Sequence, residues 1–163
     1  MPALPYRAVV LTVSDSASTG QREDTSGPAV KEVLTEEGYQ VVGREVVPDD
    51  AEVIARALLR LVEATDLVVT TGGTGLGPRD VTPEATTTVC ERMVPGMAEI
   101  MRAEGLKFTP LAALSRAVCG ARGTTLIVNL PGSPTGAVES LGSILHLIPH
   151  ALELLRGNTE HPQ

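Results

Sequence analysis

The stretch "DLVVTTGGTGLGPRDVTPEA", Asp66 to Ala85, joins a short apolar segment to a glycine-rich loop and then to the start of a helix. The apolar part, residues 66–71, has no alternation of polar and apolar positions, which indicates a strand buried on both faces. At the other end, Thr82-Pro83-Glu84 is typical of a helix start, with Thr82 as the cap. A buried strand that leads through a loop into a helix is the repeating unit of an α/β fold.

The same unit recurs along the chain. Strands are predicted within "RAVVLTV" (7–13) and "YQVVGREVVP" (39–48), and a hairpin that turns at Gly123 is predicted within "AVCGARGTTLIVNL" (117–130). Helices are predicted to begin near Ser26, near Asp49 or Asp50, and at Ser133-Pro134, and further helical segments are predicted at 95–104, 109–115 and 149–157. This alternation predicts an α/β protein with three layers, α/β/α, around a mostly parallel central sheet.

Length and composition limit the possible functions. A chain of 163 residues without a linker or repeat is expected to form one domain, residues 1–163, with any deep site at the ends of its elements or between subunits. Its net charge of −7 argues against nucleic acid as a partner, and no apolar run is long enough for a membrane span. The N-terminus does not resemble a secretory signal, so a cytoplasmic location is expected. Cys90 and Cys119 are expected to be buried thiols rather than a disulfide or a metal site.

Four loops follow the predicted strands. They are Ser14-Asp15, Pro48-Asp49-Asp50, Gly72 to Thr82, and Asn129 to Pro134. In parallel α/β sheets, ligands bind outside the carboxyl ends of the strands, where such loops gather. These loops are therefore the candidate binding elements.

The glycine-rich loop matches neither the P-loop nor the dinucleotide-binding pattern, because no lysine follows it and Pro78 stands where a glycine is needed. Its glycines nevertheless allow backbone N–H groups to approach an anion closely, and the helix that begins near Thr82 directs its positive end the same way. A tight turn and a capped helix alone would explain two glycines and Thr82-Pro83, but not the charged pair. Arg79 and Asp80 are the types of side chain that bind phosphate oxygens and Mg²⁺.

Asp49 has two possible roles. It and Asp50 precede a predicted helix, so either can cap it, and capping is the favoured role for Asp50. If Asp49 and Asp80 face one crevice, they form a two-carboxylate site for a divalent cation that bridges phosphate oxygens. His146 and His150 are not expected to bind a metal, because Pro149 interrupts the helix between them.

The glycine-rich loop, together with "VSDSASTGQREDTSGP", "VVPDD" and "NLPGSP", closely resembles the MoaB/Mog family of molybdenum-cofactor biosynthesis proteins over nearly the whole chain. The resemblance implies a molybdopterin-binding-like fold, a homotrimer or hexamer, and adenylyl transfer to molybdopterin with ATP and Mg²⁺. Asp49 and Asp80 match the family's functional aspartates and are predicted as catalytic and metal-binding residues. The predicted nucleotide-binding and pterin-phosphate-binding residues are Ser14, Asp15, Gly72, Gly73, Thr74, Gly75, Arg79, Thr82, Asn129, Pro131, Gly132 and Ser133.

The reaction implied by this resemblance needs no protein nucleophile, because the terminal phosphate of molybdopterin attacks the α-phosphorus of ATP and pyrophosphate leaves. Two alternatives stay open. One is a non-catalytic pterin-binding or carrier protein of the same family, against which the presence of both Asp49 and Asp80 argues. The other is the molybdate-insertion enzyme, which embeds a similar domain in a much longer chain. The expected partners are molybdopterin, ATP and, transiently, other enzymes of the cofactor pathway, but no nucleic acid and no membrane.

Overall fold

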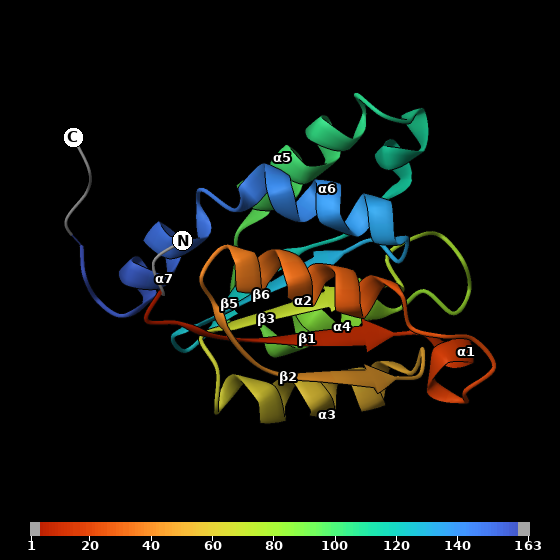
Figure 1. Ribbon diagram of the computed structural model, residues 1–163, viewed down its shortest axis with the longest axis horizontal. Helices are drawn as coiled ribbons and strands as arrows, with labels where there is room; N and C mark the ends of the chain where they lie inside the picture. Colours follow the sequence, from red (N-terminus) through yellow and green to blue (C-terminus); the bar gives the residue numbers. More distant parts are fainter. Residues whose placement is uncertain (1–3, 160–163) are drawn as a thin grey trace.

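The computed structural model describes residues 4–159, which contain a six-stranded sheet in the order β2-β1-β3-β6-β5-β4 (Figure 1). Strands β1 (Arg7–Val13), β2 (Gln40–Val47), β3 (Leu67–Thr71) and β6 (Thr125–Leu130) are parallel. Strand β5 (Cys119–Arg122) pairs antiparallel with β6, and strand β4 (Arg92–Met93) pairs antiparallel with β5 at the edge of the sheet. The predicted α/β class and mostly parallel sheet are confirmed, as is the hairpin that turns at Gly123, which connects β5 to β6.

The helices are α1 (Asp15–Ser18), α2 (Ser26–Glu36), α3 (Ala51–Val62), α4 (Thr82–Val89), α5 (Pro95–Gly105), α6 (Pro134–Ile144) and α7 (Ile148–Leu155), with a 3₁₀ helix, η1, at Pro110–Leu114. Two short elements, α1 and β4, were not predicted. Four and two residues are too few to produce a recognisable hydrophobic period. None of the helices within residues 4–159 is long and apolar enough to cross a membrane.

Two apolar clusters cover the two faces of the sheet. In β1, Ala8 and Val10 pack into the cluster that contains residues of α2, α5, α6 and α7. The alternate residues Val9 and Leu11 pack into the other cluster, with α3 and α4. Successive side chains of a strand point to opposite faces, so an uninterrupted apolar run is what a sheet with helices on both sides requires. Figure 1 shows the resulting layers, with α2 and α6 over one face and α3 over the other.

The helix starts show which predicted caps are formed. The Asp50 side chain accepts from the N–H groups of Glu52 and Val53, and Ser133 Oγ accepts from Gly136 N, so both of these caps are confirmed. The predicted cap at Thr82 is wrong. Thr82 is already the first helical residue of α4, and its fully buried hydroxyl donates to Gly72 O at 2.9 Å. The loop folds back onto the end of β3, so the hydroxyl satisfies that buried carbonyl instead of a helical N–H.

Candidate active site

Two cavities open at the edge of the sheet where the parallel strands end. The first, of about 420 Å³, is called the acidic cavity here because Glu23, Asp24, Asp49 and Asp80 line it. Arg22 is the only basic residue among the described residues of its lining. The remaining lining residues are Thr12, Val13, Ser14, Ala17, Thr25, Ser26, Thr71, Gly72, Gly73, Gly132, Ser133 and Pro134. Four carboxylates against one guanidinium would repel an anion that arrives without a counterion.

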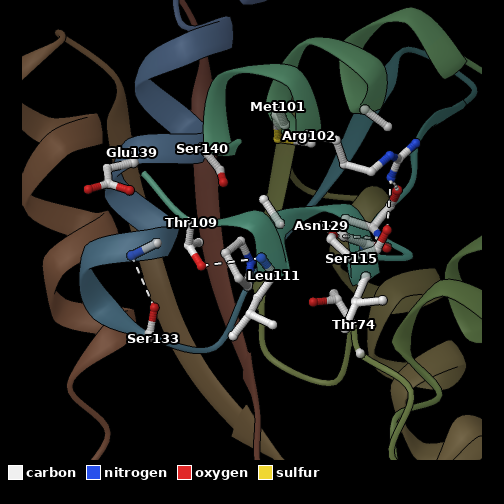
Figure 2. Close-up of a pocket in the computed structure, with 18 of the residues that line it drawn as sticks. Thr74, Met101, Arg102, Thr109, Leu111, Ser115, Asn129, Ser133, Glu139 and Ser140 are labelled. Atoms are coloured by element: carbon white, nitrogen blue, oxygen red, sulfur yellow. Dashed lines mark hydrogen bonds between the residues drawn. The ribbon is translucent and has the colours of Figure 1, made fainter. Parts of the chain in front are cut away.

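The second cavity, of about 410 Å³, is called the apolar cavity because most of its exposed wall is apolar, with Met101, Leu111 and Leu114 among the residues that line it. Figure 2 shows Met101 and Arg102 of α5 at the top of the view, Ser140 of α6 to their left, and Leu111 of η1 below them. Ser133 lines both cavities. A mostly apolar wall with a few polar groups is typical of a site for a small organic molecule.

The glycine-rich loop separates these cavities. Gly72 and Gly73 line the acidic cavity, whereas Thr74 and Gly75 line the apolar one. Gly73 has a φ of +68°, and a Cβ at this position would collide with Thr82 Oγ1 and lie 3.2 Å from Asp49 Oδ1. Glycine is therefore required here both by the backbone conformation and by the closeness of these side chains.

Asp15 and Asp49 hold each other in place across the ends of β1 and β2. Asp15 N donates to Asp49 Oδ2, and Asp49 N donates to Asp15 Oδ1, each at 2.9 Å. Because the two strands are parallel neighbours, residues that are 34 positions apart in sequence meet at the same end of the sheet. The carboxylate of Asp49 is thus tied to the backbone of the neighbouring loop.

Arg79 extends this arrangement to the glycine-rich loop. Its Nε and Nη2 atoms donate to Asp15 Oδ2 and Oδ1 at 3.0 and 3.1 Å. These two charge-assisted bonds, followed by the bond from Asp49 N, hold the pKa of Asp15 below its usual value. Arg79 was predicted to bind phosphate, but its guanidinium lies on Asp15 and its side chain lines neither cavity.

The surroundings of Asp49 raise the pKa of its carboxyl group above the usual value for an aspartate. Partial burial raises its pKa, the hydrogen bond from Asp15 N opposes this, and the negative charges of Asp15 and Asp80 raise it further. A cation between Asp49 and Asp80 would relieve both the burial and the repulsion. Among residues 4–159 no group of three or more His, Cys, Asp or Glu side chains could hold a metal ion.

Asp80 lies over the glycine-rich loop. Its Oδ2 accepts from Gly77 N at 3.0 Å, and a Cβ on Gly75 or Gly77 would come within 3.0 or 2.9 Å of that same oxygen. A side chain at either position would displace the carboxylate. Asp80 lines the acidic cavity together with Asp49, so the two predicted metal-binding residues face one cavity.

Arg116, which the sequence analysis missed, lies in the segment between η1 and β5 and binds the glycine-rich loop. Its backbone N–H donates to Thr74 O, its Nε to Gly75 O and its Nη2 to Asp80 O, at 2.7–2.8 Å. Its Nη1 also donates to both carboxylate oxygens of Glu84, which holds the pKa of Glu84 below its usual value. An isolated arginine in "ALSRAV" carries no periodic or motif signal, so only the contacts reveal its role.

Several predicted binding residues make internal contacts at this edge. Asn129 is fully buried in β6, where its Nδ2 donates to Thr70 Oγ1 and Thr86 Oγ1 and its Oδ1 accepts from Val118 N. Ser14 Oγ accepts from Ala17 N at the start of α1. A Cβ on Gly132 would lie 3.3 Å from the Cα atom of Gly72, so this glycine allows the two loops to pack closely. Pro131 and Asn129 both line the apolar cavity.

A second group that the sequence analysis missed is a set of hydroxyl groups at the acidic cavity. Thr12 Oγ1 donates to Asp24 Oδ2 at 2.8 Å, and the hydroxyls of Ser26 and Thr71 are 2.8 Å apart. Arg44 also donates to Asp24 Oδ2, at 3.0 Å. Asp24 and Ser26 of this group lie in "VSDSASTGQREDTSGP", one of the stretches that resemble the family, but their residue types are also those of an ordinary surface loop.

Comparison with known proteins identifies the family. Residues 9–150 match the family described as "Probable molybdopterin binding domain". The molybdopterin adenylyltransferase of Helicobacter pylori (strain ATCC 700392 / 26695) is 45% identical over 157 residues, which cover 91% of this chain and 87% of that protein. The protein of the same name from Escherichia coli K12 is 38% identical over 93% of this chain and 86% of its own length. The crystal structure of the molybdopterin biosynthesis enzyme MoaB from Thermus thermophilus superimposes with a TM-score of 0.88 at 51% identity, covering 93% of this chain and 97% of that one. The chain therefore belongs to the family of molybdopterin-binding domains, as its resemblance to MoaB/Mog proteins predicted.

Proposed function

We propose that the protein is a molybdopterin adenylyltransferase that transfers adenylate from ATP to the terminal phosphate of molybdopterin during molybdenum-cofactor biosynthesis. The relatives with that name support the activity. The observation that carries the proposal is the pair of cavities on either side of one glycine-rich loop. A reaction that joins two phosphate-bearing molecules requires two adjoining sites with their reactive ends at a common boundary.

The acidic cavity is proposed for the nucleotide and the apolar cavity for the pterin. A pterin ring can pack against Met101, Leu111 and the other apolar side chains. Its terminal phosphate would then lie at Thr74 and Gly75, opposite the nucleotide phosphates at Gly72 and Gly73. Backbone N–H groups of a glycine-rich loop are suited to both anions.

Magnesium fits the donor set of the acidic cavity. A triphosphate next to four carboxylates requires neutralisation that Arg22 alone cannot provide. Asp49 and Asp80 would hold the ion, with phosphate oxygens and water as the remaining ligands. When bound, Mg²⁺ supplies charge neutralisation at the phosphate oxygens.

The chain's own residues would act by binding and orienting the two substrates. A terminal phosphate oxygen of the pterin attacks the α-phosphorus, the bond from that phosphorus to the bridging oxygen breaks, and pyrophosphate leaves. The glycine-rich loop, held in shape by Arg116 and Thr82, would align these atoms. No protein side chain has to become covalently attached.

The assay is incubation with molybdopterin, ATP and Mg²⁺, followed by detection of adenylylated pterin and pyrophosphate. We expect both products with the parent protein, and neither when Mg²⁺ is chelated. A carrier protein, the alternative function, would bind molybdopterin without Mg²⁺-dependent binding of ATP and without products. The cytoplasmic location and the transient contacts with other enzymes of cofactor synthesis stay predictions.

A further inference from the structure

Two arginines, Arg22 and Arg79, lie in different surroundings at the edge of the sheet where the parallel strands end. Arg22 lines the acidic cavity, where no other described residue of the lining is basic. Arg79 lines neither cavity, and its guanidinium is bound by both carboxylate oxygens of Asp15. The two side chains therefore differ in what they can offer to a bound nucleotide.

The guanidinium of Arg22 has no hydrogen-bond or ion-pair partner within residues 4–159, although its side chain is exposed beside an acidic cavity. Its backbone is fixed, since Arg22 N donates to Ser16 O at 3.1 Å. The nearby carboxylate of Asp24 is already bonded to Arg44, Thr12 and the backbone of Gly27. An arginine at an ordinary surface site would also be expected to lack a partner. Arg22, however, lies at this cavity, where the five N–H donors of its guanidinium can bind a polyphosphate.

Arg79 is placed to act on Asp49 through Asp15. Its two bonds fix the Asp15 carboxylate, and Asp15 and Asp49 then exchange bonds between backbone N–H and side chain. This chain of contacts uses Oδ2 of Asp49 and leaves Oδ1 without a hydrogen-bond partner among the described residues. If Arg79 moved to a phosphate, Asp15 would lose the interactions that orient it.

We propose that Arg22 is the side chain that binds the polyphosphate of the nucleotide, and that Arg79 is a positioning residue that orients Asp49 through Asp15. This inference rests on the proposed function, since it assigns roles within that site. It reverses the expectation from sequence, in which Arg79 contacts phosphate.

The first experiment measures binding of α,β-methylene-ATP with saturating Mg²⁺ by calorimetry, because this analogue cannot transfer its adenylate. Arg22→Gln should weaken binding about 10- to 100-fold, the usual loss when a charged group loses its hydrogen bonds. Arg7→Gln is the matched control, because Arg7 is an exposed arginine at the opposite end of β1. Equal affinity of the parent and Arg22→Gln proteins overturns the role of Arg22.

The second experiment is a double-mutant cycle of Arg79→Gln and Asp15→Asn. The quantity measured is the Mg²⁺ concentration that gives half-maximal binding of the analogue. Each single variant should require about 10-fold more Mg²⁺, and the double variant no more than either one, because both changes break the same chain of contacts. Arg79→Gln should also lower kcat while its KM for ATP at saturating Mg²⁺ stays near the parental value. Additive effects in the cycle, or a raised KM without loss of kcat, overturn the positioning role.

These outcomes are separate from those of the proposed function. A parent protein that binds the analogue and responds to these substitutions, yet makes no adenylylated pterin, contradicts the proposed function and leaves the roles of the two arginines standing. A parent protein that transfers adenylate while Arg22→Gln binds the analogue normally contradicts the inference alone. A parent protein that does not bind the analogue overturns the inference.

Discussion

Asp49 and Asp50 are neighbours with different surroundings. Asp50 Oδ1 accepts from two N–H groups at the start of α3, whereas Asp49 Oδ2 accepts from Asp15 N and the residue lines the acidic cavity. An asparagine oxygen can accept these same hydrogen bonds but carries no charge for a cation. The two residues therefore differ in how much their function depends on charge.

We predict that Asp49→Asn lowers adenylyl transfer by orders of magnitude, at ~1.4 kcal/mol of activation free energy per tenfold, with little change in Tm. Asp50→Asn is the matched control and should retain both activity and Tm, because the cap is preserved. Product formation and thermal melts on the two proteins check this. Equal activity in both would remove Asp49 from the metal site.

Thr82 is expected to contribute through its buried hydroxyl. Thr82→Val keeps the shape of the side chain but leaves Gly72 O without its donor. The free energy of unfolding should fall by about 1–3 kcal/mol, the usual cost of an unsatisfied buried polar group. Thr82→Ser keeps the hydroxyl and should lose less stability. Denaturant unfolding of the three proteins measures both effects, and equal stability of parent and Thr82→Val would contradict the assigned contact.

At the scale of elements, the glycine-rich loop between β3 and α4 depends on a residue from another segment. The side chain of Arg116 donates to two carbonyls of the loop and to Glu84 at the start of α4. Without these bonds the loop has fewer contacts to fix the position of Asp80. Loop segments with few such contacts open more easily, which amide hydrogen exchange detects.

We therefore predict that Arg116→Gln speeds amide exchange in residues 74–84 and lowers adenylyl transfer at least tenfold. Arg122→Gln is the control, because Arg122 bonds a carbonyl at the end of α4, Val89 O, rather than the loop. Exchange measured by mass spectrometry should change in the loop only for the Arg116 variant. Unchanged exchange there would contradict the role of the Arg116 side chain in holding the loop.

At the scale of the whole molecule, the family resemblance implies a homotrimer or hexamer, and residues 95–108 contain several large apolar side chains. In the structure, Met97 and Met101 of this segment are core residues, whereas Ile100, Leu106 and Phe108 are 39%, 51% and 61% exposed. Leu111 and Leu114 of η1 are also exposed. Apolar side chains gathered on adjoining elements are typical of a surface that another protein covers.

We predict that the protein sediments as a homotrimer or hexamer at micromolar concentration. Phe108→Glu should shift the distribution toward monomer, because it places a charge in an apolar contact that the oligomer would bury between subunits. Leu154→Glu is the control and should leave the distribution unchanged, because Leu154 is an exposed residue of α7, which Figure 1 shows at the other end of the molecule from the segment after α5. A parent protein that sediments as a monomer would contradict the prediction.

The fold was largely predictable because its signals are local. The apolar run Arg7–Val13, the Asp50 cap and the Ser133-Pro134 helix start each lie within a few neighbouring residues, where periodicity and turn chemistry act. The Thr82 cap was predicted wrongly by the same local rules, since a contact with Gly72, ten residues earlier, took its hydroxyl. Local preference decides an element only when no tertiary contact competes for the same group.

The sequence alone determined the α/β class, the parallel strands and the loops that carry the candidate site, because these follow from hydrophobic period and from the residue types in the turns. Tertiary structure decided the strand order, the two cavities and the partners of each charge. Asp15 meets Asp49 and Arg79 from 34 and 64 positions away, and no local pattern encodes those distances. Parallel pairing of β1 with β2 and β3 aligns the carboxyl ends of these strands, so the loops that follow them meet at one edge. The folds of those loops place Arg79 on Asp15 and Arg22 at the acidic cavity.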